Sequence, residues 1–256
     1  MAKLFCISDA HLGAQNPELE QLKKEKLTSF LNYVLQEDGE LIINGDLFDF
    51  WFEYRHAVPR QHFQILAQLS NFVNTGKKIH YIAGNHDFWL DSFLEDQVGL
   101  ILHRDEYELE FDGKKYYIRH GDGLLKKDYL YRGLKKVLRN PVNIFLYRLL
   151  HPDFGIPLAL HFSHQSRTAA KKQTDYSDSD YREFAFNKID KGYDFVLLGH
   201  THWPAKAKHL DGWYLNSGHW MGPFTFIVVE NAVPKVLQWD GEKSMEIELA
   251  LPPGNI

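Results

Sequence analysis

This sequence has little cysteine, no long apolar run and no strong overall charge. Its 256 residues include one cysteine, Cys6, so an intramolecular disulfide is excluded. No apolar stretch is long enough to span a bilayer, and the residues between Lys3 and Ser8 are too few for the core of a signal peptide. The formal net charge is only −5. We therefore expect a cytoplasmic protein that keeps its first apolar segment as a strand.

Length and composition favour one globular domain over residues 1–256. The chain is 44% hydrophobic and alternates strand-like with helix-like segments, which is typical of an α/β enzyme of this size. One helix is expected to start at Asn16, where a cap residue precedes proline and an acid, and a second from about Pro59 to Thr75, ended by Gly76. Their predicted core positions are Leu19, Leu22, Phe30, Val34 and Leu35 in the first, and Phe63, Leu66, Leu69, Phe72 and Val73 in the second.

Five short polar clusters each follow an apolar run that is typical of a buried strand. The runs are Leu4–Ile7, Leu41–Ile43, Ile79–Ala83, Tyr116–Ile118 and Phe195–Leu198. The clusters are Asp9-x-His11, Gly45-Asp46-x-x-Asp49, Gly84-Asn85-His86-Asp87, His120-Gly121-Asp122 and Gly199-His200-Thr201-His202. Any one cluster alone is an ordinary turn. Because ligands of α/β sheets bind beyond the carboxyl ends of strands, we predict that all five converge on one site.

The residue types in these clusters are those that two divalent ions require. Ions ~3.5–4 Å apart repel each other, so a carboxylate such as Asp46 is needed to bridge them. The remaining ligands divide into two shells that share Asp46 and contain no thiolate, which suits Mn, Fe, Co or Zn, with manganese as the first choice. One shell is assigned Asp9, His11, Asp46 and His202, and the other Asp46, Asn85, His120 and His200.

The order and content of the five clusters resemble the calcineurin-like metallophosphoesterase superfamily, from Ala2 to about His219. The resemblance implies a fold of two facing β-sheets flanked by helices, and hydrolysis in which a metal-activated water attacks phosphorus in line. It implies the same seven metal ligands. It also assigns His86 to the phosphate oxygen or the leaving group, and Asp49 to orienting His86, which is consistent with a carboxylate fixing the tautomer of a histidine.

The segment from Leu124 to Lys172 differs in charge from the rest of the chain. It contains ten basic and two acidic residues, a formal charge of +8, so that the remainder carries −13 against the total of −5. It is also rich in large apolar residues, from Tyr129 to Leu150. This combination favours a lid that faces an anionic membrane surface. The competing interpretation is a packed helical excursion whose outer face is simply solvated. Nucleic acid is not expected, because Leu and Ile outnumber base-stacking aromatics here.

Core and insert together are similar to the UDP-2,3-diacylglucosamine hydrolase family of lipid A synthesis. That resemblance implies cleavage of a diphosphate to UMP and a diacylated glucosamine 1-phosphate, with a helical lid inserted at about 124–185 and acyl chains held between lid and core. It implies a lipid-linked sugar nucleotide as substrate and a peripheral position on the inner face of the cell membrane. The substrate-site positions that it implies are Asp122, Ser166, Arg167 and Lys171.

One departure keeps other functions open. Better-known members of the lipid family carry Arg after the metal-ligating Asn, whereas this chain has His86, the residue usual in the wider superfamily. A nuclease or nucleotide phosphodiesterase is therefore an alternative. A protein phosphatase is disfavoured, because that resemblance calls for Glu in place of Asp87. A scaffold without activity should have lost ligands, and all seven are present.

Several aromatic and histidine residues have less certain assignments from sequence. The run from Phe50 to His56 is either a pocket rim or a surface that packs the lid. His219 follows an apolar run and receives no role. The other histidines are interpreted as packing or surface residues, namely His80, His103, His151, His161 and His164.

Overall fold

The computed structural model describes residues 3–172 and 178–249, with the backbone alone for residues 127 and 164–172. Two β-sheets form the centre of the molecule. The seven-stranded sheet has the order β12 (Ser244–Glu246), β11 (Val233–Trp239), β10 (Thr225–Glu230), β1 (Lys3–Ile7), β2 (Glu40–Asn44), β3 (Ile79–Ile82), β4 (Ile101–His103). The five-stranded sheet has the order β5 (Glu106–Phe111), β6 (Lys114–Arg119), β7 (Phe195–Leu198), β9 (Gly212–Ser217), β8 (Pro204–His209).

All five strands predicted from the sequence are confirmed, and they are divided between the two sheets. β1, β2 and β3 are parallel neighbours in the seven-stranded sheet, while β6 and β7 are parallel neighbours in the other. The sheets meet through apolar side chains such as Cys6 and Ile42 from one and Ile118 and Leu197 from the other. Alternate residues of β1, such as Phe5, point to the opposite face, as strand geometry requires.

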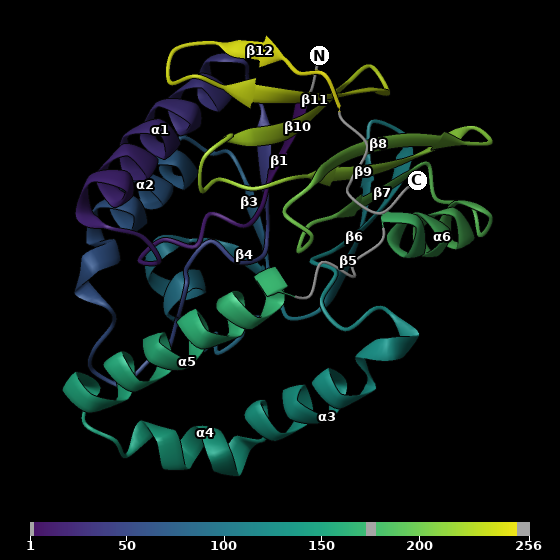
Figure 1. Ribbon diagram of the computed structural model, residues 1–256. Coiled ribbons are helices and arrows are strands. Elements are labelled where there is room, and N and C mark those ends of the chain that lie inside the picture. The colour runs from purple at the N-terminus through teal and green to yellow at the C-terminus, as the bar shows by residue number, and fades with distance from the viewer. Residues whose placement is uncertain (1–2, 173–177, 250–256) are drawn as a thin grey trace.

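Helices cover the outer face of each sheet (Figure 1). α1 (Pro17–Gln36) and α2 (Phe63–Asn74), which follows a short turn at Arg60–His62, lie over the seven-stranded sheet. α6 (Asp178–Ile189) packs on the five-stranded sheet through Tyr181, Ala185 and Ile189. Another short helical segment, Leu94–Val98, precedes β4. The predicted fold, two facing sheets flanked by helices, is therefore confirmed.

α1 begins where the sequence indicated, but its first turns face solvent. The Asn16 side chain accepts a hydrogen bond from the Leu19 N–H at 3.0 Å, and proline follows at the first helical position. The prediction that Leu19 and Leu22 face the core is wrong, because they are 41% and 39% exposed. The buried stripe instead runs through Lys23, Leu27, Phe30, Leu31 and Val34. Lys23 takes a core position because its ammonium group has carbonyl partners, described below.

α2 follows its prediction except at its start. Leu66, Leu69 and Phe72 are buried, and Gly76 has a φ of 88°, which suits the residue that ends a helix. Phe63 was predicted to face the core and is 71% exposed. It is the first residue of the helix, and Ile65 occupies the buried face in its place.

A helical insert lies apart from both sheets, at the bottom of Figure 1. After a short turn at Lys126–Asp128, it consists of α3 (Tyr129–Leu138), α4 (Pro141–Arg148) and α5 (Pro152–Lys172). We call these three helices the insert helices. Residues 124–185, predicted as the lid, thus include the insert helices and the first part of α6, which belongs to the packing of the five-stranded sheet. Across the described residues, we find no helix with the length and apolar character of a membrane span.

The insert helices expose large apolar side chains. Leu130 is 73% exposed and Phe154 is 75% exposed. Others on the same helices, or in the turn between α4 and α5, are at least 40% exposed, namely Tyr129, Leu134, Val137, Val142, Phe145, Leu146, Leu149, Leu150, Leu158 and Phe162. Monomeric proteins rarely leave so many apolar side chains together in water, and such surfaces usually meet a ligand, a membrane or a protein.

Candidate metal centre

The loops after β1, β2, β3, β6 and β7 meet at one place, as predicted. Backbone hydrogen bonds join the first two loops, with Asp9 N–H donating to Gly45 O at 3.1 Å and His11 N–H to Asp46 O at 2.9 Å. Gly199 N–H donates to His120 O at 2.8 Å, which joins the loops of the other sheet. The site therefore lies where the strand ends of the two facing sheets come together.

The first predicted shell is assembled around Asp9. His202 Nε2 lies 3.1 Å from Asp9 Oδ1, and His11 Nε2 lies 3.8 Å from the same atom. The two Nε2 atoms are 3.2 Å apart. Asp46 Oδ2 is 3.6 Å from His11 Nε2. One cation could therefore contact all four side chains.

The second predicted shell is assembled around His120. Its Nε2 lies 3.3 Å from Asp46 Oδ2 and 3.2 Å from Asn85 Oδ1. The ring of His200 lies beside it, with centroids 5.3 Å apart. His120 Nδ1 is 2.8 Å from the Asn44 carbonyl, to which it donates, so Nε2 is left to act as a ligand. Asp46 thus contacts both groups of ligands, the arrangement expected of a bridging carboxylate.

Backbone strain and close packing hold these ligands in place. Five of the seven have positive φ, a conformation that non-glycine residues rarely adopt outside functional sites. They are Asp9 (55°), His11 (43°), Asp46 (54°), His200 (67°) and His202 (60°). Gly84 has a further role, because a Cβ there would lie 2.0 Å from Asp46 Oδ1. Only glycine lets the two loops approach this closely.

The charges of the buried groups suit a cation. Burial opposes ionisation of Asp46, but nearby imidazoles, His120 first, outweigh it and hold the pKa of Asp46 well below its usual range. Burial, helped by the charge of His120, lowers the pKa of His200 to about 4, so this ring is neutral at pH 7. Burial also disfavours charge on His120, yet Asp46 and Asp9 raise its pKa well above normal. A bound cation would take the place of that proton.

The donor set fits divalent ions. Asp9 Oδ1 is buried and accepts no hydrogen bond from the described residues, although three imidazole Nε2 atoms lie 3.1–3.9 Å from it. A buried carboxylate oxygen that accepts no hydrogen bond is poorly stabilised unless a cation lies beside it. The combination of imidazole, carboxylate and amide oxygen without thiolate matches first-row divalent metals.

His86 borders the metal ligands. Its donor atom, with those of His11 and Asp46, forms a group within 4.8 Å. Burial is the main reason that the pKa of His86 is lowered to about 4, against the raising effect of Asp46. Asp49 Oδ1, predicted to orient this ring, lies 3.6 Å from His86 Nδ1 and 3.5 Å from His11 Nδ1. The carboxylate therefore lies between a predicted metal ligand and the residue predicted to contact phosphate.

The sequence that forms this site is similar to a known protein family. Residues 2–204 match the calcineurin-like phosphoesterase family. The chain belongs to this family. It is accordingly a metal-dependent phosphoesterase, and divalent ions are implied at the Asp and His cluster described above.

Named relatives of the phosphoesterase act on a lipid-linked sugar nucleotide. The chain is 31% identical over 222 residues to the UDP-2,3-diacylglucosamine hydrolase of Porphyromonas gingivalis, covering 78% of this chain and 83% of that protein. It is also 31% identical over 252 residues to the UDP-2,3-diacylglucosamine hydrolase of Aromatoleum aromaticum, covering 94% of each chain.

The insert helices of this phosphoesterase reach the metal centre at two points. Asp122, a predicted substrate contact, is buried and accepts hydrogen bonds from Tyr131 at 2.8 Å and Lys135 at 2.7 Å, both on α3. On the other side, Ser163 of α5 lies 2.9 Å from His86 Nδ1. The remaining predicted substrate contacts, Ser166, Arg167 and Lys171, are on α5, and their side chains lie outside the described residues.

The aromatic run after Asp49 packs against the insert helices. Tyr147 of α4 contacts the ring of Phe52 at a centroid distance of 4.6 Å and that of Trp89 at 4.9 Å. Trp89 Nε1–H also donates to the Leu138 carbonyl at 2.8 Å. Of the two interpretations that the sequence allowed for Phe50–His56, the structure thus shows contact with the insert helices.

Sequence reasoning missed three supporting residues. Lys23 is 2% exposed and donates to the carbonyls of Ala10 (3.0 Å) and His11 (2.8 Å), which holds the first loop in place. The signal was a lysine at a core position of α1. Asp87 accepts hydrogen bonds from the backbone N–H groups of Asp46, Phe48 and Gly84. Asp87 could have been found from the sequence, because it belongs to one of the five polar clusters. The third residue, Ser163, had no such indication in the sequence.

Two further histidines are now placed. His219, given no role, lies beside His202 with ring centroids 5.5 Å apart and the rings tilted by 35°. His103 was placed beyond a helix by sequence reasoning and instead lies on β4, with Nε2 3.1 Å from His80 Nδ1 on β3. His80 and His103 are therefore packing residues, as predicted.

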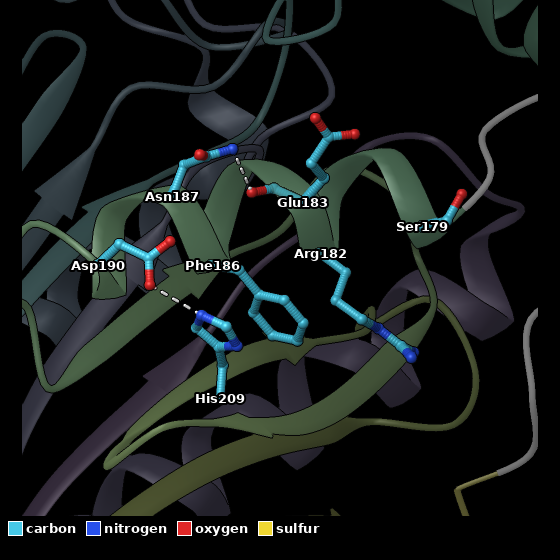
Figure 2. A pocket seen from close by; sticks show the side chains of 7 residues that line it. All are labelled: Ser179, Arg182, Glu183, Phe186, Asn187, Asp190 and His209. Carbon is cyan, nitrogen blue, oxygen red and sulfur yellow. Dashed lines mark hydrogen bonds and ion pairs between the residues drawn. The ribbon is translucent and has the colours of Figure 1, made fainter.

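A surface pocket also lies between α6 and β8 (Figure 2). Figure 2 shows Phe186 and His209 side by side in it, with ring centroids 4.3 Å apart, and His209 bonded to Asp190 at 2.9 Å. None of its lining residues is a predicted site residue. The metal centre, and not this pocket, is the site that the family assigns to catalysis.

Proposed function

We propose that this protein hydrolyses the diphosphate of UDP-2,3-diacylglucosamine, releasing UMP and a diacylated glucosamine 1-phosphate. The observation that carries the proposal is the position of the apolar insert helices, which bond to both sides of the metal centre through Asp122 and Ser163. A substrate with acyl chains and a diphosphate needs an apolar surface beside a phosphoesterase site. Relatives named for this substrate match most of the chain at 31% identity.

Each part of the site has a task in this reaction. Bound divalent ions, with manganese as our proposal, supply positive charge to the phosphate oxygens and lower the pKa of water. Asp9, His11, Asp46 and His202 hold one ion, and Asp46, Asn85, His120 and His200 hold the other. His86 donates to a phosphate oxygen or the leaving group, and Asp49 fixes the orientation of that ring.

The basic and apolar surface of the insert supports contact with an anionic membrane. Residues 124–172 carry a formal charge of +8 within a chain of −5. Arginine and lysine attract acidic headgroups, and the exposed leucine and phenylalanine side chains can enter the acyl boundary. We propose that the protein works on the inner face of the cell membrane, where the insert helices take the substrate from the lipid surface.

The test is UMP release from UDP-2,3-diacylglucosamine by manganese-loaded protein, with a nitrophenyl phosphodiester in parallel and Asp46→Asn as the control. Rapid release that is lost in the variant and with chelator is the expected result. Turnover of the generic ester alone would reject the lipid substrate and favour a nucleotide or phosphodiester hydrolase, which His86 in place of the family's Arg also leaves open. Absence of metal-dependent turnover on either would favour a scaffold.

A further inference from the structure

Ser163 joins α5 of the insert to two residues of the site. Its Oγ lies 2.9 Å from His86 Nδ1, 3.1 Å from Asp49 Oδ1 and 3.2 Å from the Asp49 carbonyl oxygen. The serine is half-buried, and its partners come from the loops after β2 and β3. A side chain from the insert therefore contributes directly to the surroundings of His86.

The Asp49 carboxylate by itself is poorly placed to orient His86, and the direct contact of Asp49 with this ring is through its backbone carbonyl oxygen, 3.2 Å from His86 Nδ1. Its Oδ1 is 3.6 Å from His86 Nδ1, beyond the 2.7–3.2 Å range of N–H···O hydrogen bonds. It is about as close to His11 Nδ1, at 3.5 Å. The carboxylate alone does not select one ring over the other, so the link between the Asp49 carboxylate and His86 that the sequence predicted needs a bridge.

The hydroxyl of Ser163 has the right donor and acceptor groups for that bridge. A serine donates one hydrogen and accepts through two lone pairs. Both Asp49 oxygens can only accept, so Ser163 donates to Asp49, and its lone pairs face His86 Nδ1. His86 Nδ1 then carries the hydrogen of this contact. The ring is fixed through one nitrogen, which leaves Nε2 for the substrate.

We propose that Ser163 is a positioning residue that holds His86 for reaction by linking it to Asp49. Because Ser163 belongs to α5, correct placement of His86 depends on the insert lying against the metal centre. Binding of substrate by the insert helices is thereby coupled to the orientation of His86. The inference rests on the role proposed above for His86.

The experiment measures kcat and KM for UMP release by wild type, Ser163→Ala, His86→Ala and the double variant. Loss of one hydrogen bond to a catalytic group should lower kcat of Ser163→Ala by about 10-fold, with KM nearly unchanged. In the His86→Ala background, the serine substitution should have no further effect, because its target is gone. Ser163→Thr keeps the hydroxyl and should recover most of the rate.

Tyr147→Phe is the matched control, since it removes a 2.6 Å hydrogen bond to the Gly155 carbonyl within the same insert. It should leave kcat within about 2-fold of the wild-type value, which would show that a general loosening of the insert does not explain the effect of Ser163→Ala. Equal losses from Ser163→Ala with and without His86 would overturn the inference, as would a rate of Ser163→Ala equal to wild type. Full activity of His86→Ala would instead refute the proposed role of His86. If only the nitrophenyl phosphodiester is hydrolysed, the same comparison is made on that substrate.

Discussion

At the residue scale, the candidate metal centre is a set of buried carboxylates and imidazoles whose charges suit a cation. Asp9 and Asp46 are fully buried beside imidazoles, and two carboxylates in that position would otherwise repel. His86 is not among the seven predicted ligands, and its Nδ1 contacts the Asp49 carbonyl and the Ser163 hydroxyl. Substitution of a predicted ligand should therefore reduce both metal content and activity, whereas substitution of His86 should reduce activity alone.

His86→Ala should lower kcat by roughly 10²–10⁴, the usual effect of losing a positioned acid or base, with metal content nearly intact. Asp46→Asn should lose both activity and metal, because it contacts both groups of ligands. The measurement is steady-state kinetics with metal analysis of the purified variants. Equal loss of metal in the two would contradict the separation of roles.

Lys23→Met should destabilise the first ligand loop. Its hydrogen bonds to the Ala10 and His11 carbonyls would be lost, at a cost of about 1–3 kcal/mol for each buried group left without a partner. We expect a lower midpoint of thermal unfolding and weaker metal binding by calorimetry. Lys24→Met is the matched control, because Lys24 makes an exposed bond to Gln61 O. Similar midpoints for the two variants would refute this role.

At the element scale, the strand ends determine where ligands can be, and the insert determines what lies beside them. The loops after β2 and β3 approach so closely that only glycine, which has no Cβ, fits at position 84. The insert helices are less tightly packed and expose an apolar surface. Substitutions in these two elements should therefore have different consequences.

Gly84→Ala should move Asp46, because the added Cβ would lie 2.0 Å from Oδ1 and 2.5 Å from the backbone nitrogen. Metal affinity should fall, and activity should fall by about 10²-fold or more, since catalysis is sensitive to ångström displacements. Gly222→Ala, where a Cβ meets nothing within 4 Å, is the control. Metal titration and kinetics decide the matter, and unchanged affinity in Gly84→Ala would show that the loops can relax.

Replacing Leu130 and Phe154 by serine should weaken lipid substrates selectively. Both side chains are more than 70% exposed on the insert, and loss of their contacts with acyl chains should reduce kcat/KM by about 10-fold or more. The nitrophenyl phosphodiester should be hydrolysed at the wild-type rate. Phe63→Ser is the control, since Phe63 is 71% exposed on α2. Equal losses on both substrates would refute a lipid-binding insert.

At the scale of the whole molecule, stability depends on three apolar layers, one between the sheets and one beneath the helices on each outer face. His62 is buried in the outer layer of the seven-stranded sheet, against the rings of Phe48 and Trp51. Neither ring nitrogen has a hydrogen-bond partner among the described residues. Protonation of this side chain should therefore oppose folding.

The free energy of unfolding should decrease as the pH is lowered, because His62 must be protonated. Burial, with the charges of Lys24 and Lys23, lowers the pKa of His62 to about 3, while unfolded histidine titrates near about 6.5. Between these values the unfolded chain binds more protons, so the contribution of neutral His62 is complete above about pH 6.5 and is lost as pH falls toward 3, by up to about 1.4 kcal/mol per unit.

Denaturant unfolding between pH 7 and 4.5 measures this effect as the difference between wild type and His62→Phe, which keeps an aromatic ring. The variant should lose less stability on acidification. His56→Phe, at an exposed histidine, should behave as wild type. Parallel pH dependences for wild type and His62→Phe would show that another group is responsible.

The sequence by itself determined the strands, the clusters that follow them and the family. Apolar runs such as Leu41–Ile43 are local signals of strands. The residue types of the polar cluster after each run indicate metal binding without knowledge of the fold. β1, β2, β3, β6 and β7 were therefore predicted correctly. That two sheets share these strands followed from the resemblance, since periodicity does not reveal which strands pair.

Tertiary structure alone decided which side chains support the site. Ser163 is 77 residues from His86 along the chain, and only the placement of α5 brings them into contact. Leu19 and Leu22 fit the helical pattern but face water. Lys23 is buried because two carbonyl groups receive its ammonium hydrogens. Burial and hydrogen bonding depend on neighbours distant in sequence, so local patterns could not predict them.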